Sequence, residues 1–132
     1  MKLTLTLTIT SLLSILLLTF HLTDDTLHAK VGTAEAGGST LVAVPILVVW
    51  LYGTLMLAGR RSGYIIMLIG SLLGLLIPVV HVTGAAGVFH GQIAKSGGDF
   101  LFVWTLHALG VTAMLSLILS TIGLLSLQRA NR

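Results

Sequence analysis

Four long apolar segments, none of which contains Asp, Glu, Lys or Arg, constrain this chain more than any other feature. They cover residues 3–22, 41–58, 64–83 and 100–127. A helix needs about 20 apolar residues to cross the hydrocarbon core of a bilayer. Because lipid offers no hydrogen-bond partners, only helices and closed barrels satisfy their backbone there. We therefore predict an all-α membrane protein, an antiparallel four-transmembrane-helix bundle.

The bounds of the predicted helices follow from the apolar runs and the turn residues between them. The helices are expected over about residues 3–30, 41–58, 64–83 and 100–127 of a single transmembrane domain, 1–132. Large apolar residues and Thr alternate over residues 3–10, a pattern typical of a strand. A lone strand cannot satisfy its backbone in lipid, so helix is favoured there too. Gly37-Gly38 predicts a turn before the second helix, which would place Pro45 in the first turns of that helix.

The composition excludes several classes of protein. Only 8% of the residues are charged and 55% are hydrophobic, whereas a soluble domain carries roughly 25% charged residues. The net charge of +3 comes from a few dispersed basic residues, which argues against a nucleic-acid partner. The chain has no cysteine, which excludes disulfides and thiolate ligands.

The charged residues and histidines are sorted between the two ends of the predicted helices. One end holds all histidines and acidic residues: His21, His28, His81, His90, His107, Asp24, Asp25, Glu35 and Asp99. The other end holds Lys2, Arg60, Arg61, Arg129 and Arg132. Because short basic loops face the cytoplasm, we expect a multi-pass protein with both termini inside.

A cleaved signal peptide is the alternative interpretation of the first segment. Lys2 provides a minimal positive region, and Ala34-Glu35-Ala36 has the small-x-small form of a cleavage site. That site lies too far beyond the apolar run, and Leu27-His28-Ala29 is a poor substitute. A retained transmembrane helix is therefore favoured.

Small residues within the segments predict where helices pack. Gly70 and Gly74 form a GxxxG pattern, which permits close approach of a neighbouring helix. A second small-residue face consists of Ala113, Ser116, Ser120 and Gly123. Pro78 leaves the carbonyl of Gly74 without its usual partner, so a bend is expected below His81. These faces predict packing within the bundle, with contact between copies as the alternative.

The densest polar group is a candidate metal site. If the first helix continues to about residue 30, His21, Asp25 and His28 share one stripe. His81 offers a third imidazole from the third segment. Imidazole and carboxylate ligands suit Zn, Cu(II), Ni or Fe(II). The alternative is a hydrogen-bonded polar cap at the membrane boundary, because this spacing is not an established metal signature.

Two further interpretations of the histidines remain open. His81 and His107 are candidate axial ligands for a tetrapyrrole, since membrane haem is often held by histidines from neighbouring helices. A pH-sensing face is the other, because histidine titrates near neutral pH. The residues do not identify a cofactor. A transport pathway is not favoured, because no acidic or basic residue lies deep in any segment.

Four stretches carry a resemblance to a known group, and the resemblance covers most of the chain. Val48-Val49-Trp50-Leu51-Tyr52-Gly53-Thr54, Arg60-Arg61-Ser62-Gly63-Tyr64, Pro78-Val79-Val80-His81 and Phe102-Val103-Trp104-Thr105-Leu106 carry the resemblance. They are similar to an uncharacterised family of small bacterial membrane proteins with four predicted transmembrane helices. The resemblance implies a bacterial inner (cytoplasmic) membrane and assigns no functional residue.

The expected function follows from how little of the chain could carry out chemistry. Little of the chain lies outside the membrane, and no nucleophile motif, phosphate-binding loop or dinucleotide fingerprint is present. We therefore expect a non-enzymatic accessory or structural subunit, whose partners are the bilayer and other membrane subunits or further copies of itself. The alternative is a metal- or tetrapyrrole-binding membrane protein that uses the outer His/Asp cluster.

Overall fold

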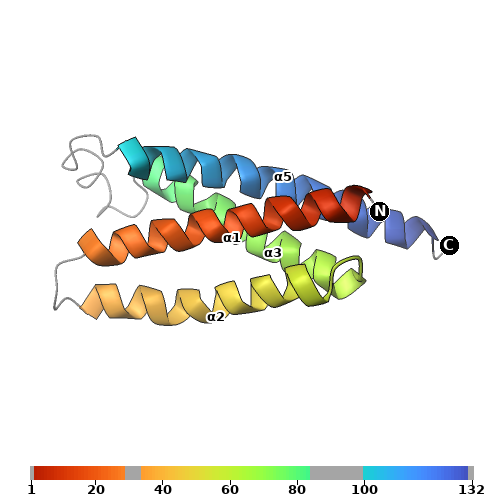
Figure 1. Ribbon diagram of the computed structural model, residues 1–132, viewed down its shortest axis with the longest axis horizontal. Helices are drawn as coiled ribbons and strands as arrows, with labels where there is room; N and C mark the ends of the chain where they lie inside the picture. Colours follow the sequence, from red (N-terminus) through yellow and green to blue (C-terminus); the bar gives the residue numbers. More distant parts are fainter. Residues whose placement is uncertain (1, 29–33, 84–99, 131–132) are drawn as a thin grey trace.

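The computed structural model describes residues 2–28, 34–83 and 100–130, and these residues form four helices. The helices are α1 (Lys2–His28), α2 (Ala34–Met56), α3 (Arg61–Thr83) and α5 (Phe100–Ala130). Consecutive helices run in opposite directions, and both ends of the chain lie at one end of the molecule (Figure 1). The fold is all-helical, as predicted.

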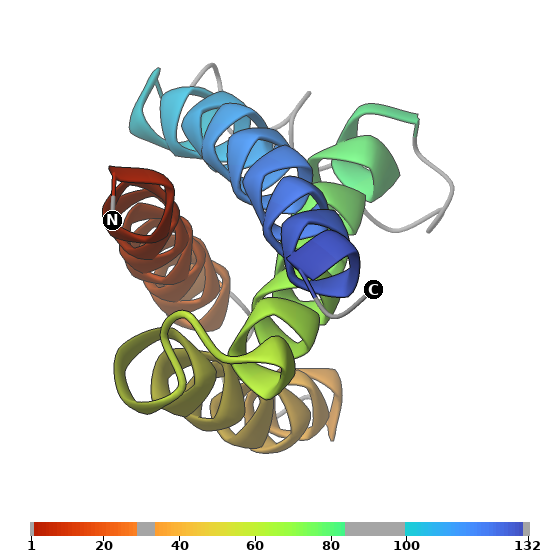
Figure 2. The ribbon, with the colours of Figure 1, turned by 90° about the vertical axis from the view of Figure 1, so that its right-hand side faces the viewer.

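The helices are arranged around a common interior (Figure 2). Both α1 and α3 pack against α2 and α5, whereas α1 and α3 contact each other only weakly across the diagonal. The pairings of α5 are more extensive than those of α2. Within Val42–Met56, only Trp50, Gly53 and Thr54 are buried. The helix α2 therefore lies at the edge of the bundle and is attached through a narrow stripe.

Three helices are long and apolar enough to cross a membrane. Their candidate spans are Lys2–Asp24, Arg61–Val79 and Val103–Ala130, with 23, 19 and 28 residues. The described apolar part of α2 is shorter, Val42–Met56. The sequence predicted four membrane-crossing helices. In the described residues, three of these four helices have the required length and hydropathy.

The predicted start of the second helix was wrong. α2 begins at Ala34, seven residues before the predicted start at residue 41, and ends at Met56. Gly37-Gly38 therefore lies inside the helix, and Pro45 lies in its interior rather than in its first turns. Glycine costs a helix only about 1 kcal/mol per residue, which lowers helix propensity without ending the helix.

A glycine turn joins α2 to α3. Gly59 has φ +79°, a left-handed conformation that favours glycine. The Arg60 amide donates to the Leu57 carbonyl at 3.0 Å, which closes the turn. A Cβ on Gly63 would collide with the Leu57 carbonyl oxygen, so the chain passes back over itself closely. α3 consequently starts at Arg61, three residues earlier than predicted.

The exterior of the molecule is apolar and part of its interior is polar. All four helices expose large hydrophobic side chains, for example Leu5, Val48, Ile69 and Val111. The fully buried residues include Ser11, Ser14, Thr54, Ser71, Ser116 and Ser120. A soluble monomer rarely exposes large apolar patches. Lipid as solvent reverses that preference, because small and hydroxyl residues then hold helices together.

Candidate functional site

A ring of hydrogen bonds joins α1 to α2 in the interior. The Trp50 Nε1–H donates to Ser11 Oγ at 2.9 Å. Thr54 Oγ1 donates to the Trp50 carbonyl at 2.8 Å, so its only proton is used. Ser11 must then donate in the 2.8 Å contact between its Oγ and Thr54 Oγ1. Each hydroxyl of the ring therefore both donates and accepts a hydrogen bond.

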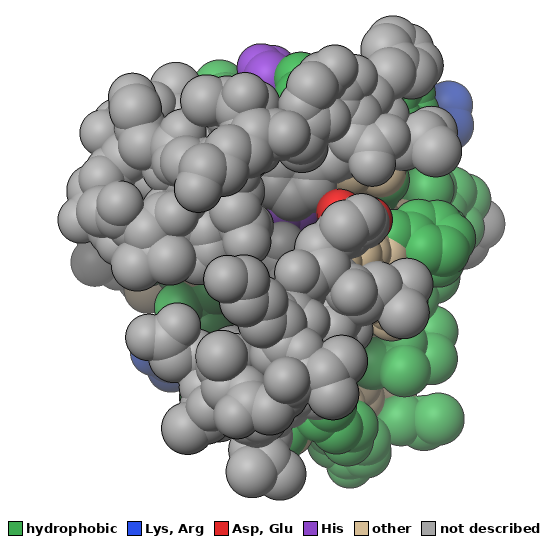
Figure 3. Space-filling view, turned by 90° about the vertical axis from the view of Figure 1, so that its left-hand side faces the viewer, with side chains coloured by type: hydrophobic (Ala, Val, Ile, Leu, Met, Phe, Trp, Pro, Cys, Tyr) green, Lys and Arg blue, Asp and Glu red, His purple; other side chains and the backbone are tan. Residues whose placement is uncertain are grey.

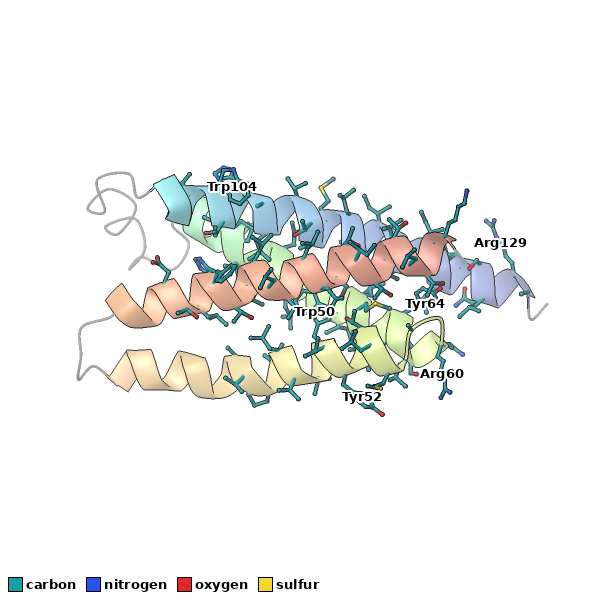
Figure 4. The ribbon with its side chains drawn as sticks, in the orientation of Figure 1. Trp50, Tyr52, Arg60, Tyr64, Trp104 and Arg129 are labelled. Atoms are coloured by element: carbon teal, nitrogen blue, oxygen red, sulfur yellow. The ribbon has the colours of Figure 1, made fainter. Side chains whose placement is uncertain are left out.

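The indole of Trp50 lies in a hollow formed by the glycines of α3. A Cβ on Gly70 would lie 2.6 Å from Trp50 Cε2, inside van der Waals contact. A Cβ on Gly74 would lie 3.2 Å from Trp50 Cη2 and 3.5 Å from Ala113 Cβ. Figure 4 shows Trp50 on the side of α2 that faces the other helices, with Tyr52 on the opposite side. The GxxxG pattern thus receives an aromatic ring from α2.

A second pair of hydroxyls joins α3 to α5. Ser71 Oγ has two acceptors in range, Ser116 Oγ at 2.8 Å and the Met67 carbonyl at 2.6 Å. Ser120 Oγ donates to the Ser116 carbonyl at 2.7 Å. All three serines are fully buried. The small-residue face of α5 therefore meets α3 through a direct serine–serine contact.

Tyr64 forms a similar contact nearer the chain termini. Its ring occupies the space that a Cβ on Gly123 would need. Its hydroxyl lies 3.3 Å from Thr4 Oγ1 on α1, and the side chain is 5% exposed. An aromatic ring seated on a glycine thus occurs twice in this bundle, at Trp50 and at Tyr64.

These interior polar groups are suited to holding helices together. The hydrogen-bond ring of Trp50, Ser11 and Thr54 and the pair Ser71–Ser116 contain only hydroxyl, indole and backbone groups. None of these groups titrates near neutral pH. Their hydrogen bonds are made within the protein, so their protons are not available to a substrate. This arrangement supports packing more than acid–base chemistry.

The histidine end has two described imidazoles in different surroundings. His21 of α1 is 1% exposed and precedes the half-buried Asp24 by three residues. His107 of α5 is exposed, and its Nδ1 lies 2.7 Å from the Val103 carbonyl oxygen. Because a carbonyl only accepts, this distance assigns the proton to Nδ1 and leaves Nε2 of the neutral ring as a lone-pair donor. Histidine and acidic side chains among the described residues are visible at this end in Figure 3.

The predicted metal and tetrapyrrole ligands are described only in part. Of His21, Asp25, His28 and His81, only His21 has a described side chain; the other three lie outside the described side chains. The helical backbone of α1 reaches His28, which keeps its three predicted ligands in helical register. Among the described residues, no group of three His, Cys, Asp or Glu is placed to hold a metal ion. His107 lies at the surface of α5. Its predicted partner as a tetrapyrrole ligand is His81, whose side chain is not among the described ones.

Sequence reasoning did not single out Ser11. Its role depends on how α1 is rotated about its axis, which a single hydroxyl in an apolar run does not reveal. The available signal was the combination of Trp50 with Thr54 four residues later, which lie on one face of a helix. No protein-family model, no curated protein and no solved structure matches this chain.

Proposed function

We propose that this protein is a four-span membrane protein that acts as a non-enzymatic accessory or structural subunit of a membrane assembly. The observation that carries the proposal is the use of the interior polar groups. Trp50, Ser11 and Thr54 bind one another, and Ser71 binds Ser116. These hydrogen bonds of the described interior link α1 to α2 and α3 to α5, while α2 presents an apolar outer surface.

The charge distribution supports an orientation with both termini in the cytoplasm. Arg60 and Arg129 lie at one end of the bundle and Trp104 towards the other (Figure 4). Between His107 and Gln128, α5 carries residues 108–127 without a charge, which spans about 30 Å at 1.5 Å per residue. That length equals the hydrocarbon thickness of a bilayer, and basic residues favour the cytoplasmic side. A bacterial inner membrane is the proposed location.

Cross-linking from the outer face of α2 tests the subunit role. We expect a photoreactive residue at Val48, which is 59% exposed, to capture a defined membrane protein in native membranes. The matched control is the same residue at Val111 on α5, which is 61% exposed, so that lipid-facing background is measured. His107→Ala should leave the captured band unchanged. Equal and diffuse labelling from both positions, with no partner co-purifying, would contradict the subunit role.

A metal- or tetrapyrrole-binding role is the second candidate, and the geometry of His107 favours it. Its Nδ1–H bond to the Val103 carbonyl fixes the ring of this exposed residue, an arrangement common for ligating histidines. Under the subunit proposal, elemental analysis of the detergent-purified protein should find no stoichiometric Fe, Cu, Zn, Ni or Mg.

Two variants separate the forms of this second candidate. One Fe or Mg per chain, with a visible absorption band that His107→Ala removes, would establish the tetrapyrrole role. A colourless metal that His21→Ala removes and His107→Ala leaves would establish the metal site instead. Protein that stays metal-free after incubation with these ions would exclude the metal site, and protein that also takes up no added haem would exclude the tetrapyrrole role.

A further inference from the structure

A cavity opens between the α2–α3 turn and the last turns of α5. Its volume is about 350 Å³, and it is lined by Gly59, Arg60, Arg61, Leu124, Leu127 and Gln128. Ligand pockets in proteins begin at about this size. The cavity lies at the basic end of the bundle, where Arg60 and Arg129 project (Figure 4). It is separate from the histidine end and from the interior hydrogen bonds.

Two basic residues, Arg60 and Arg61, are among those that line the cavity. The acidic residues of the sequence are numbers 24, 25, 35 and 99, and Asp24, the one with a described side chain, lies towards the other end of α1. The start of α3 and the end of α5 contribute about half a charge each, of opposite sign. The arginines therefore set the sign of the local potential.

The wall of the cavity combines this charge with apolar surface. Leu124 and Leu127 are half-buried residues of α5 at the basic end of the bundle. Gln128 follows directly and adds amide donors where that stretch ends. Guanidinium groups bind phosphate through paired, charge-assisted hydrogen bonds. A ligand that matches both the arginines and the leucines has a phosphate group and a short apolar portion.

We propose that this cavity binds the headgroup of an anionic phospholipid. Arg60 and Arg61 bind the phosphate, Gln128 donates to headgroup oxygens, and Leu124 and Leu127 contact the glycerol and the first acyl methylenes. Basic pockets between helices at the cytoplasmic surface bind such lipids. A free phosphate ion would leave the leucine wall unused. The inference rests on the membrane insertion proposed above and not on the subunit role.

Native mass spectrometry of the detergent-purified full chain tests this site. Phosphatidylglycerol is the probe and phosphatidylcholine is the zwitterionic comparison. We expect one phosphatidylglycerol to be retained per chain in preference to phosphatidylcholine. Arg60→Gln and Arg61→Gln should each weaken its binding about tenfold, since a hydrogen bond to a charged group contributes about 1.5 kcal/mol or more.

Arg129→Gln is the matched control, because it removes one positive charge from the same end without lining the cavity. It should weaken binding less than about twofold, as expected for an exposed charge. Leu124→Trp, which occupies part of the cavity at its apolar wall and keeps every charge, should abolish the preference for phosphatidylglycerol. Equal losses in all three arginine variants would overturn the proposal in favour of diffuse attraction.

Two further outcomes would also overturn the proposal. Full displacement of the lipid by millimolar inorganic phosphate would indicate a phosphate site rather than a lipid site. Retention of the lipid by Leu124→Trp would place it elsewhere on the surface. Circular dichroism of each variant checks that the helices remain folded, and the arginine variants keep the test decisive if Leu124→Trp unfolds. Alkaline extraction of native membranes tests insertion separately, so a failure of insertion is distinguishable from a failure of lipid binding.

Discussion

Replacing Trp50 with alanine is expected to lower the free energy of unfolding by about 3 kcal/mol, the lower end of the range for large aromatic residues in protein interiors. The indole is 1% exposed and fills the hollow over Gly70 and Gly74. The lower end applies because apolar side chains of the unfolded state remain covered by detergent, so the lost contribution is packing rather than transfer from water. The measurement is unfolding of the detergent-solubilised protein by a denaturing detergent, followed by circular dichroism.

Three variants divide this loss between packing and hydrogen bonding. Trp104→Ala is the control, because Trp104 is 57% exposed and should change stability by less than about 0.5 kcal/mol. Trp50→Phe keeps most of the ring and removes the Nε1–H donor. Ser11→Ala keeps the ring and leaves that donor buried without its acceptor, at a cost of about 1 kcal/mol. Equal stabilities of Trp50→Ala and Trp104→Ala would show that Trp50 does not hold α2 to the bundle.

The helices were predictable from sequence because the constraint on them is simple. A charge-free run of about 20 residues in lipid has few alternatives to a helix, and the runs near residues 3–22, 64–83 and 100–127 each lie within an observed helix. The predicted start of α2 was wrong because Gly37-Gly38 was interpreted as a turn, whereas both glycines lie inside the helix. Local glycine signals identify turns reliably only when the backbone requires positive φ, as at Gly59.

The interior contacts were less predictable, because they depend on the rotation of each helix. The glycines of α3 indicated a close approach, but the sequence did not say that Trp50 would be the side chain to fill it. Ser11 and Thr54 meet across two helices and 43 positions of sequence, a separation that local spacing cannot connect. The histidines show the same limit. His21 and His107 belong to one end of the sequence pattern, yet one is buried in the bundle and the other is exposed on α5.

Gly70→Ala is expected to lower the free energy of unfolding by about 1–3 kcal/mol, the usual cost of overpacking a filled interior. The new Cβ would lie 2.6 Å from both Trp50 Cε2 and Trp50 Cγ. These atoms belong to a rigid ring whose Nε1 is held by Ser11, so the ring cannot move without breaking that bond. Gly74→Ala is the matched control in the same helix. Its Cβ would meet the far edge of the ring at 3.2 Å and Ala113 Cβ at 3.5 Å.

The helix propensity of alanine makes the comparison sharper. Alanine favours a helix over glycine by about 1 kcal/mol, so Gly74→Ala should be close to neutral, while Gly70→Ala destabilises despite the same gain. In a Trp50→Ala background the collision is removed, and Gly70→Ala should then stabilise the protein by about 1 kcal/mol. The sign of the Gly70→Ala effect therefore depends on the residue at position 50. A destabilising effect of equal size in both backgrounds would mean that the ring does not rest on Gly70, and the attachment of α2 to α3 would need a different explanation.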